Sequence, residues 1–408
     1  MKARSIRINT ISFGRIVGIH LIYANDIISI ESVGHRFYDR ISAETDADVK
    51  FIDCLEVANC DTVFFVGLNT DSLKGSKKLA NAYYVCPGDN LHFQVWDMPP
   101  VDIDKDYKGC RIGMETINIC NAHCPMCKCN TLSRKFNRMT LSLSERVVSQ
   151  AINHPEIQTI NMYMNGEPLL DQKLENRIRL ANNKGIPYIR ISTNATLLTP
   201  SRFLSLREAG LDEITISLDA PAQMKHESIR PGTNFNLIIE YLSLIIKEKK
   251  ERKLLRPGII IGMIVGDDNY HIMGEMCVFV SNLFGIEIAP INKPGIVFLN
   301  DKEGLGMFIS KRFDWTGDYS NQDVRKIIPG PCPGYKDLII FSDGRMPFCC
   351  LDSEGNNIIG DLSKDNLDNI VKSSTRRKMI SAIEENRLWD IPKNCRKCSL
   401  LYEDRSCR

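Results

Sequence analysis

Between residues 110 and 300, short apolar runs alternate with longer segments whose apolar positions recur with a helical period. Helices are predicted at 142–153, 172–184, 199–210, 234–250 and 271–284, and strands at 115–119, 159–164, 187–193, 213–219, 258–265 and 286–291. Strands that alternate with helices of this length indicate βαβ units and a parallel sheet. Five or six repeats are too few for a closed eightfold barrel. The pattern therefore predicts an α/β fold of the partial (β/α)6 barrel type.

Local signals mark the ends of several predicted helices. Ser142 with Glu145 three positions later is a capping-box pattern, so the first helix is predicted to begin at Ser142. Gly185 and Gly210 follow apolar periodic segments, where a glycine commonly ends a helix. Pro200 after Thr199 suits the first turn of a helix.

The remaining chain has a different pattern. Residues 1–97 contain short β-branched and aromatic runs punctuated by Gly, Asn and Asp, which predicts a β-rich N-terminal domain, either a small sandwich or an open barrel. The stretch 98–109 has two prolines and several acids and is interpreted as a linker. Residues 301–331 lack a periodic pattern and are expected to be irregular, and 332–408 is a short cysteine-bearing segment punctuated by glycine.

Charge and composition narrow the functional classes. The chain has 52 basic and 50 acidic residues, a net charge of +2, so no nucleic acid and no anionic membrane is expected as a partner. Arg15, His20 and Asp26 interrupt the apolar residues near the start, which argues against a signal peptide or membrane span. We therefore expect a cytoplasmic protein. In that reducing compartment, 15 cysteines indicate metal or redox chemistry rather than disulfides.

The cysteines gather in two places. Cys120, Cys124 and Cys127 form a C-x3-C-x2-C triplet. Three thiolates on one short loop can hold three irons of a [4Fe–4S] cluster and leave the fourth iron open to a small molecule. A structural zinc site, completed by Cys129 and His123, is the alternative, because zinc usually takes four such ligands.

Polar motifs follow the predicted strands in order along the chain. The cysteine triplet follows the first strand, and polar or turn-forming residues follow or end the next three: Asn165-Gly166-Glu167-Pro168, Ser192-Thr193-Asn194, and Ser217-Leu218-Asp219 with Arg230 beyond. Ligands of parallel α/β folds bind at the carboxyl ends of the strands. The order of these motifs therefore predicts one binding site at that edge.

The triplet and this order of motifs resemble the radical S-adenosylmethionine (radical SAM) family over 110–300. The resemblance implies a radical SAM barrel in which Cys120, Cys124 and Cys127 bind the catalytic [4Fe–4S] cluster. It implies that Gly166, Glu167 and Pro168 contact the amino group of SAM, although Asn165 stands where glycine is commoner. Ribose, carboxylate and adenine contacts are implied for Ser192, Asn194, Ser217, Asp219, Arg230 and Met126. Each of these could instead be ordinary strand-end capping or packing.

The C-terminal cysteines give a second, independent pattern. Cys332, Gly344 and Cys349 form a C-x11-G-x4-C pattern, and Cys350 follows directly. A C-x2-C pair, Cys395 and Cys398, comes later in the chain. This pattern resembles the SPASM/twitch extension of radical SAM enzymes, which implies one auxiliary [4Fe–4S] cluster in a domain spanning 301–408. Adjacent Cys349 and Cys350 would point to opposite faces of a strand, so only one is expected to bind, and the spacing favours Cys349. Zinc remains an alternative here too.

Three functions are compatible with these features. The leading hypothesis is a radical SAM oxidoreductase that dehydrogenates or epimerises a small polyol, sugar or aminocyclitol, with a flavodoxin or ferredoxin as electron donor. The second is a maturase of a ribosomally made peptide. The third is a zinc-stabilised binding protein without turnover. The cofactors implied by the first two are SAM, its [4Fe–4S] cluster and one auxiliary [4Fe–4S] cluster.

Overall fold

The computed structural model describes most of the barrel and C-terminal segment and the strands of the N-terminal part. The described residues are Tyr107, 110–288, Pro294, 297–300, 303–312, 332–385, Arg387 and 390–398, together with nine strands between residues 5 and 97. The predicted linker, apart from Tyr107, lies outside these residues, and so do Cys54, Cys60, Cys86 and Cys407.

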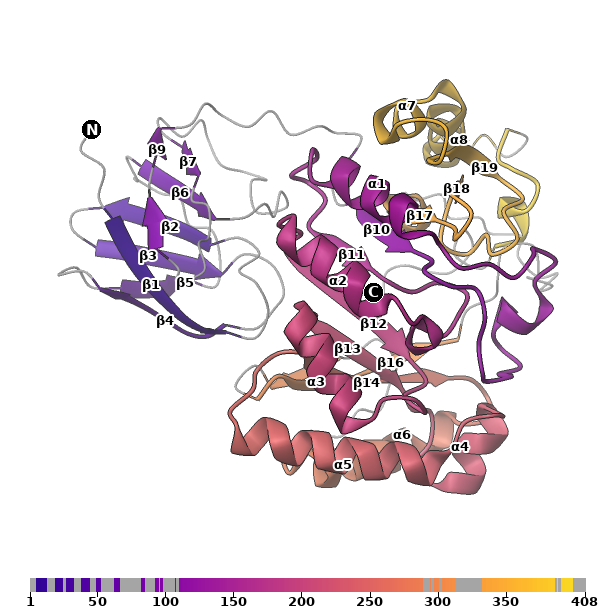
Figure 1. Ribbon diagram of the computed structural model, residues 1–408, viewed down its shortest axis with the longest axis horizontal. Helices are drawn as coiled ribbons and strands as arrows, with labels where there is room; N and C mark the ends of the chain where they lie inside the picture. The colour runs from indigo at the N-terminus through magenta and orange to yellow at the C-terminus, as the bar shows by residue number, and fades with distance from the viewer. Residues whose placement is uncertain are drawn as a thin grey trace.

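An eight-stranded sheet forms the centre of the fold (Figure 1), in the order β15-β16-β14-β13-β12-β11-β10-β17. All neighbouring strands are parallel except β15, which is antiparallel to β16. The strands are β10 (Arg111–Met114), β11 (Thr159–Asn161), β12 (Tyr188–Thr193), β13 (Glu213–Ser217), β14 (Gly258–Val265), β15 (Val297–Asn300), β16 (Leu305–Lys311) and β17 (Asp337–Ile340). The mostly parallel α/β architecture predicted from the sequence is confirmed.

Helices follow the strands as the hydrophobic periodicity predicted. They are α1 (Leu141–Ala151), α2 (Leu174–Asn183), α3 (Pro200–Ala209), α4 (Gln223–Ile229), α5 (Phe235–Glu251) and α6 (Met273–Phe284). Local chemistry sets their ends. Thr199 caps α3 by accepting from the Arg202 amide, and Gly210 ends it at φ +99°, a conformation that favours glycine. No helix in the described part of the chain is long and apolar enough to cross a membrane.

The two faces of the sheet differ in polarity. Ile160, Ile189, Ile191, Ile214 and Ile216 belong to the main hydrophobic core, which they share with side chains of the covering helices. Successive strand residues point to opposite faces. Asn161, Arg190 and Glu213, which are neighbours in register across β11, β12 and β13, therefore lie on the face away from these helices. In the described part of the chain this second face, called the polar face below, carries these polar side chains beside a small apolar cluster that includes Tyr188 and Ile260.

The N-terminal strands form two further sheets, one of three strands in the order β4-β1-β8 and one of six in the order β5-β3-β2-β6-β7-β9. This confirms that residues 1–97 are rich in strands. Their bounds are β1 (Ser5–Ser12), β2 (Ile19–Ala24), β3 (Ile27–Ser32), β4 (Tyr38–Glu44), β5 (Val49–Ile52), β6 (Thr62–Val66), β7 (Ala82–Tyr84), β8 (His92–Gln94) and β9 (Trp96–Asp97).

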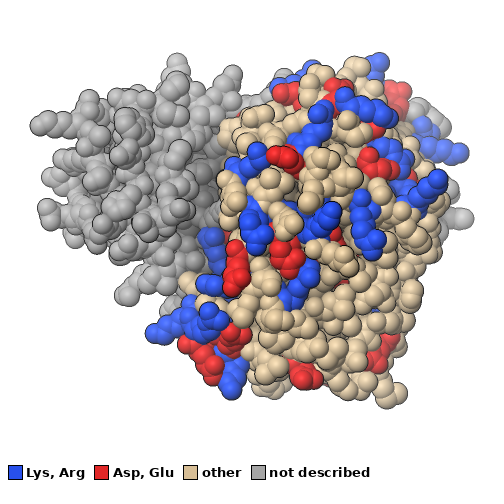
Figure 2. Space-filling view, in the orientation of Figure 1, with Lys and Arg blue, Asp and Glu red and all other residues tan. Residues whose placement is uncertain are grey.

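The C-terminal segment packs beside the β10–β17 end of the central sheet (Figure 1). It contains the hairpin β18 (Arg345–Pro347) and β19 (Ile358–Asp361), then α7 (Leu367–Val371) and α8 (Ser374–Glu384). Its first strand, β17, pairs in parallel with β10, the first strand of the barrel. Lys and Arg are interspersed with Asp and Glu over the described surface in Figure 2, as the balanced composition predicts.

Four local predictions are wrong. The first strand of the barrel is β10, which ends before the predicted strand at 115–119. Residues 115–119 form no strand, and their only β-type pairing in the described chain is an isolated bridge at Ile117. Residues 286–288 form no strand, and 289–291 lie outside the described residues; β16 occupies the next place in the sheet instead. Because β16 spans Leu305–Lys311, the segment 301–331 is not wholly irregular. Helix α1 begins at Leu141, because the Thr140 hydroxyl accepts from the Leu143 amide and so caps it ahead of Ser142.

Candidate active site

The cysteine loop follows β10 and is held together by backbone hydrogen bonds to its own sulfurs. The amide of Ala122 donates to Cys120 Sγ at 3.4 Å, and the amide of Cys129 donates to Cys127 Sγ at 3.5 Å. The Cys127 amide donates to the Cys124 carbonyl at 3.0 Å, which closes a turn between those two thiols. N–H groups directed at sulfur stabilise thiolates, the form that binds iron.

The three thiols lie close enough to affect one another. Burial raises the pKa of Cys124 to about 11, with Arg230 opposing the rise and the charges of Cys127 and Cys120 adding to it. Burial also raises the pKa of Cys127, and Cys120 adds to that rise. A hydrogen bond with the Cys129 thiol lowers the pKa of Cys120 to about 6. Such a compact, half-buried set of thiols suits a metal centre, whose binding releases the remaining protons.

A second loop fixes the position of the cysteine loop. The amide of His123 donates to the Pro231 carbonyl at 2.7 Å. Gly232 has φ +88°, and a Cβ there would lie 2.8 Å from the Asn121 carbonyl oxygen. The loop after α4 therefore packs directly against the cysteine loop at a position that only glycine fits well.

Arg230 brings a positive charge from this second loop to the thiols. Its Nη1 lies 4.0 Å from Cys124 Sγ, and its Nε donates to Asp219 Oδ2 at 2.6 Å. Asp219 is fully buried, and its other oxygen accepts from the Ile264 amide at 2.8 Å. The end of β13, the α4 loop and the cysteine loop are thus joined through one ion pair.

The motif after β11 also packs against the cysteine loop. A Cβ on Gly166 would lie 2.2 Å from the Ile117 carbonyl oxygen and 3.0 Å from that of Ile119. The Glu167 amide donates to the same Ile119 oxygen at 2.9 Å. Two backbones therefore touch here, and a side chain at Gly166 would separate them.

Glu167 is a buried carboxylate that links two of the predicted motifs. It accepts hydrogen bonds from the Leu169 amide at 3.0 Å, the Thr193 hydroxyl at 2.6 Å and the Asn194 amide at 2.9 Å. Burial raises its pKa to about 7, against the effect of these donors. Asn194 in turn donates to Asn121 Oδ1 at 2.8 Å, and its Nδ2 lies 3.9 Å from Cys120 Sγ.

The structure brings most of the predicted SAM contacts to this edge of the sheet. Ser192 and Ser217 are half-buried on β12 and β13, and Met126 packs against the core beside the thiols. Pro168 begins a short 3-10 helix, Pro168–Leu170, that Glu167 caps. The contact roles of these residues remain predictions.

Sequence reasoning missed three residues that shape the site. Asn121 accepts from Asn194, and Asn269 donates to the Asp219 carbonyl at 3.2 Å. His226 is fully buried, and its Nδ1 accepts from the Asp219 amide at 3.4 Å. Asn121 stands between two cysteines of the triplet, which was a usable signal. His226 and Asn269 approach Asp219 only through the folded loops.

The C-terminal cysteines form a second group. Cys332, Cys349, Cys395 and Cys398 are all buried. A Cβ on Gly334 would lie 3.2 Å from Cys349 Cβ and 3.5 Å from Cys332 Sγ, so these two cysteines flank one glycine. Burial raises the pKa of Cys395, and the charges of the other three cysteines raise it further.

Cys350 has different surroundings from Cys349. Burial raises the pKa of Cys349 to about 12, and Cys332 and Cys398 contribute to the rise. Burial also raises the pKa of Cys350, and the charges of Cys349, Asp337 and Cys332 add to the rise whereas Arg111 opposes it. The effect of Cys349 on Cys395 places Cys349 near the C-x2-C pair. The surroundings of the two thiols therefore favour Cys349 as the fourth member of the group.

Among the residues that the structure describes, no set of three or more His, Cys, Asp or Glu side chains is placed to hold one metal ion. In an iron–sulfur cluster each thiolate binds a different iron, so the sulfurs need not converge on one point.

Comparisons with known proteins identify both parts. Residues 114–276 match the model of the radical SAM superfamily, and residues 332–399 match that of the SPASM iron–sulfur cluster-binding domain. A curated relative, the tungsten-containing aldehyde ferredoxin oxidoreductase cofactor-modifying protein of Pyrococcus furiosus, is 25% identical over 170 residues, which cover 42% of this chain and 48% of that protein. The chain thus spans about half the length of this relative.

Solved structures agree with the fold. Native anSMEcpe with bound AdoMet superposes with a TM-score of 0.51 at 13% identity, covering 72% of this chain and 88% of that one. SuiB of Streptococcus suis bound to S-adenosylmethionine gives 0.50 at 15% identity, covering 72% of each chain. The cofactors of this chain are accordingly SAM with a [4Fe–4S] cluster and an auxiliary iron–sulfur cluster. Residues 114–276 of this chain are a radical SAM domain, and residues 332–399 are a SPASM iron–sulfur domain.

Proposed function

We propose that this enzyme is an oxidoreductase that dehydrogenates or epimerises a small polyol, sugar or aminocyclitol. When bound, the barrel cluster and SAM supply a 5′-deoxyadenosyl radical that removes a substrate hydrogen atom, and the auxiliary cluster supplies an acceptor for one electron. The protein contributes ligands, orientation and exclusion of water.

Two sets of thiols would hold the clusters. Cys120, Cys124 and Cys127 would bind the barrel cluster and leave one iron open for SAM. Cys332, Cys349, Cys395 and Cys398 would bind the auxiliary cluster and close it. The mutual charge effects among the members of each set support this assignment.

The remaining predicted residues would orient SAM. Gly166 allows the backbone after β11 to approach the cysteine loop, so that carbonyl groups there can receive the SAM amino group. The Arg230 guanidinium, held by Asp219, offers a positive charge beside Cys124 that suits the SAM carboxylate. Glu167 fixes the Thr193–Asn194 segment, which would face the ribose.

The observation that carries the proposed substrate class is the polar face of the sheet. Arg190 donates to the Tyr163 hydroxyl at 2.9 Å and lies 3.6 Å from Glu213. The buried Oδ1 of Asn161, their neighbour in register, has no hydrogen-bond partner among the described residues. A hydroxyl or amino group of a small polar substrate would donate to Asn161 Oδ1, whereas an apolar substrate would leave this oxygen unpaired.

The experiment is a substrate screen under anaerobic conditions. Reconstituted enzyme, SAM and a reductant such as flavodoxin or ferredoxin are incubated with polyols, sugars, aminocyclitols and, in a separate arm, precursor peptides. We expect 5′-deoxyadenosine formation to rise with a polar small molecule and a keto, imino or epimeric product to appear. A response to peptides alone would replace this proposal with the peptide-maturase function.

A variant of the polar face tests the same proposal. Arg190→Met keeps the length of the side chain but removes the charge that faces Tyr163 and Glu213. We expect a KM for the polar substrate about tenfold higher, since a charged hydrogen bond is worth about 1.5–3 kcal/mol, with SAM affinity retained. Arg179→Met is the matched control, because Arg179 lies exposed on α2. Equal KM values for the two variants would remove the polar face from the binding site.

A further inference from the structure

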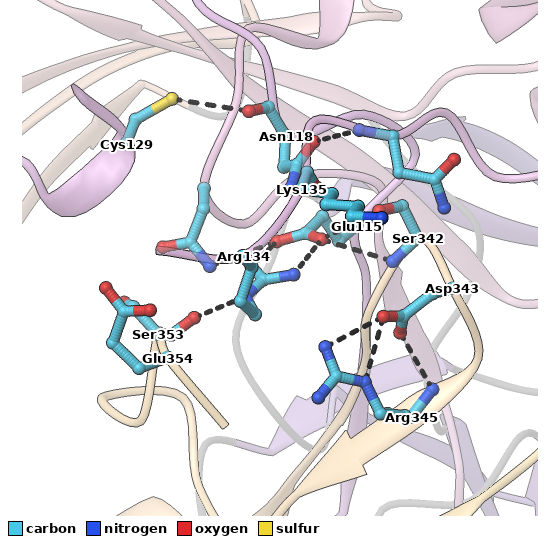
Figure 3. Close-up of polar contacts among 12 residues, drawn as sticks. Glu115, Asn118, Cys129, Arg134, Lys135, Ser342, Asp343, Arg345, Ser353 and Glu354 are labelled. Carbon is cyan, nitrogen blue, oxygen red and sulfur yellow. Dashed lines mark hydrogen bonds and ion pairs between the residues drawn. The ribbon is translucent and has the colours of Figure 1, made fainter. Parts of the chain in front are cut away.

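A buried carboxylate joins the two cofactor-binding parts of the chain. Glu115, directly after β10, is fully buried. Its Oε1 accepts from Arg134 Nη1 at 3.1 Å, the Ser342 amide at 3.1 Å and the Ser342 hydroxyl at 3.0 Å. Its Oε2 accepts from Arg134 Nη2 at 2.7 Å and Asn165 Nδ2 at 3.0 Å. Figure 3 shows Glu115 between Arg134 and Ser342.

The partner arginine belongs to the segment between the cysteine loop and α1. Arg134 Nε donates to the Ser353 carbonyl at 2.6 Å, and its guanidinium carbon lies 3.7 Å from the centre of the Phe341 ring. Phe341, Ser342 and Ser353 all belong to the SPASM domain. The side chains of Arg134 and Glu115 are only 4% and 0% exposed, so water cannot replace a lost partner.

The third member of the network lies beside the motif predicted to contact SAM. Asn165 immediately precedes Gly166. A carboxylate accepts hydrogen bonds, so the Asn165 side chain must direct its NH2 group, and not its oxygen, toward Glu115. One carboxylate therefore holds together the loop after β11, the segment after the cysteine loop and the turn between β17 and β18 of the SPASM domain.

We propose that Glu115 and Arg134 are positioning residues that couple SAM binding in the barrel to the packing of the SPASM domain through Asn165 and Ser342. The inference rests on the proposed contact between Gly166–Pro168 and SAM. When the SPASM domain packs, Ser342 completes the Glu115 contacts, and Glu115 holds Asn165 and the following glycine in place for SAM. Coupling of this kind is reciprocal, so bound SAM must stabilise the packed SPASM segment to the same extent.

The first test uses the wild-type holoenzyme and amide hydrogen exchange. Exchange is measured anaerobically with and without saturating SAM, on peptides that include 341–354. The Ser342 amide is a direct reporter, because it donates to Glu115. We expect SAM to slow exchange in this segment at least fivefold, which is the lower end of usual coupling. Unchanged exchange in protein that binds SAM would overturn the proposal.

The second test breaks the link at two points and compares the variants with a matched control. Asn165→Gly removes the amide but keeps a residue that tolerates the local backbone, and Glu115→Gln removes the charge. Glu354→Gln is the control. The Glu354 carboxylate also joins the two segments, accepting from the Ser133 hydroxyl at 2.6 Å, but it does so at the exposed surface and apart from Asn165.

We expect Asn165→Gly and Glu115→Gln to raise the Kd for SAM five- to tenfold at full iron content, and to abolish the effect of SAM on exchange at 341–354. Glu354→Gln should change neither. Wild-type Kd values and retained protection in Asn165→Gly would refute the coupling even if Glu115→Gln fails to fold. Wild-type holoenzyme that binds no SAM would instead contradict the proposed function itself.

Discussion

Replacing Gly166 with alanine tests the packing of the motif after β11 against the cysteine loop. The new Cβ would lie 2.2 Å from the Ile117 carbonyl oxygen and 2.9 Å from its carbon. Both are backbone atoms, so rotation of a side chain cannot relieve the overlap. A carbon–oxygen contact is normally about 3.3 Å, so one of the two backbones must move by about 1 Å.

The size of the effect follows from that displacement. Overpacking of this kind costs about 1–3 kcal/mol of folding stability. A displacement of about 1 Å in a binding element can cost roughly 100-fold in function. We therefore expect Gly166→Ala to fold with a lower thermal midpoint and to bind SAM about 10- to 100-fold more weakly.

The assay is equilibrium binding of SAM to anaerobically reconstituted protein whose iron content is measured on the same sample. Gly274→Ala is the matched control, because a Cβ on Gly274 at the start of α6 meets nothing within 4 Å. That variant should bind SAM normally and be slightly more stable, since alanine favours a helix over glycine by about 1 kcal/mol. Wild-type affinity in fully loaded Gly166→Ala would refute the close-packing argument.

Three further predictions concern the clusters and one buried histidine. Wild-type protein should hold about eight irons, and changing Cys120, Cys124 and Cys127 to alanine should leave about four; stoichiometric zinc without labile sulfide would contradict this. Changing Cys395 and Cys398 to alanine should keep 5′-deoxyadenosine formation but abolish the oxidised product. Cys349→Ala should have the same effect, whereas Cys350→Ala should leave product formation intact. If protein that lacks the auxiliary cluster still forms product at the wild-type rate, that cluster is structural. Burial lowers the pKa of His226 to about 4, so the neutral ring stabilises the fold above its ordinary pKa of about 6.5, and about 3 kcal/mol is lost as the pH falls towards 4. Thermal unfolding of apoprotein at pH 7 and pH 5 should show a smaller acid-induced drop for His226→Gln than for His271→Gln, whose parent histidine is exposed; equal drops would refute the assignment.

The sequence predicted the elements whose signals are local. The strand β14 is almost wholly buried, and its apolar run GIIIGMIV was sufficient to define it. The helix α5 begins after Asn234, whose side chain accepts from the Leu237 amide, within a residue of the predicted start. The cysteine spacings and the order of the polar motifs were likewise enough to identify the family and its cofactors.

Features that depend on distant partners were not predictable in this way. The strand that pairs with β14 is β16, and not residues 286–288. Pairing with the sheet, rather than an apolar run alone, decides which segment becomes a strand. The sequence pattern predicts that Glu115 begins an apolar strand, although a carboxylate in such a run is itself a signal of a buried polar contact. Its partners Arg134, Asn165 and Ser342 are up to 227 residues away. The preference for Cys349 over Cys350 stays a prediction.

The pairing of β10 with β17 has a consequence for the order in which the chain can mature. Arg111 and Asp337, which face each other across these strands, are 226 residues apart. At a translation rate of about 5–20 residues per second, β10 waits roughly 10–45 s on the ribosome for its neighbour. During that time one edge of the sheet lacks its strand, and the Glu115 carboxylate lacks Ser342. A truncated chain that ends before β17 would therefore leave β10 as an exposed, aggregation-prone edge strand.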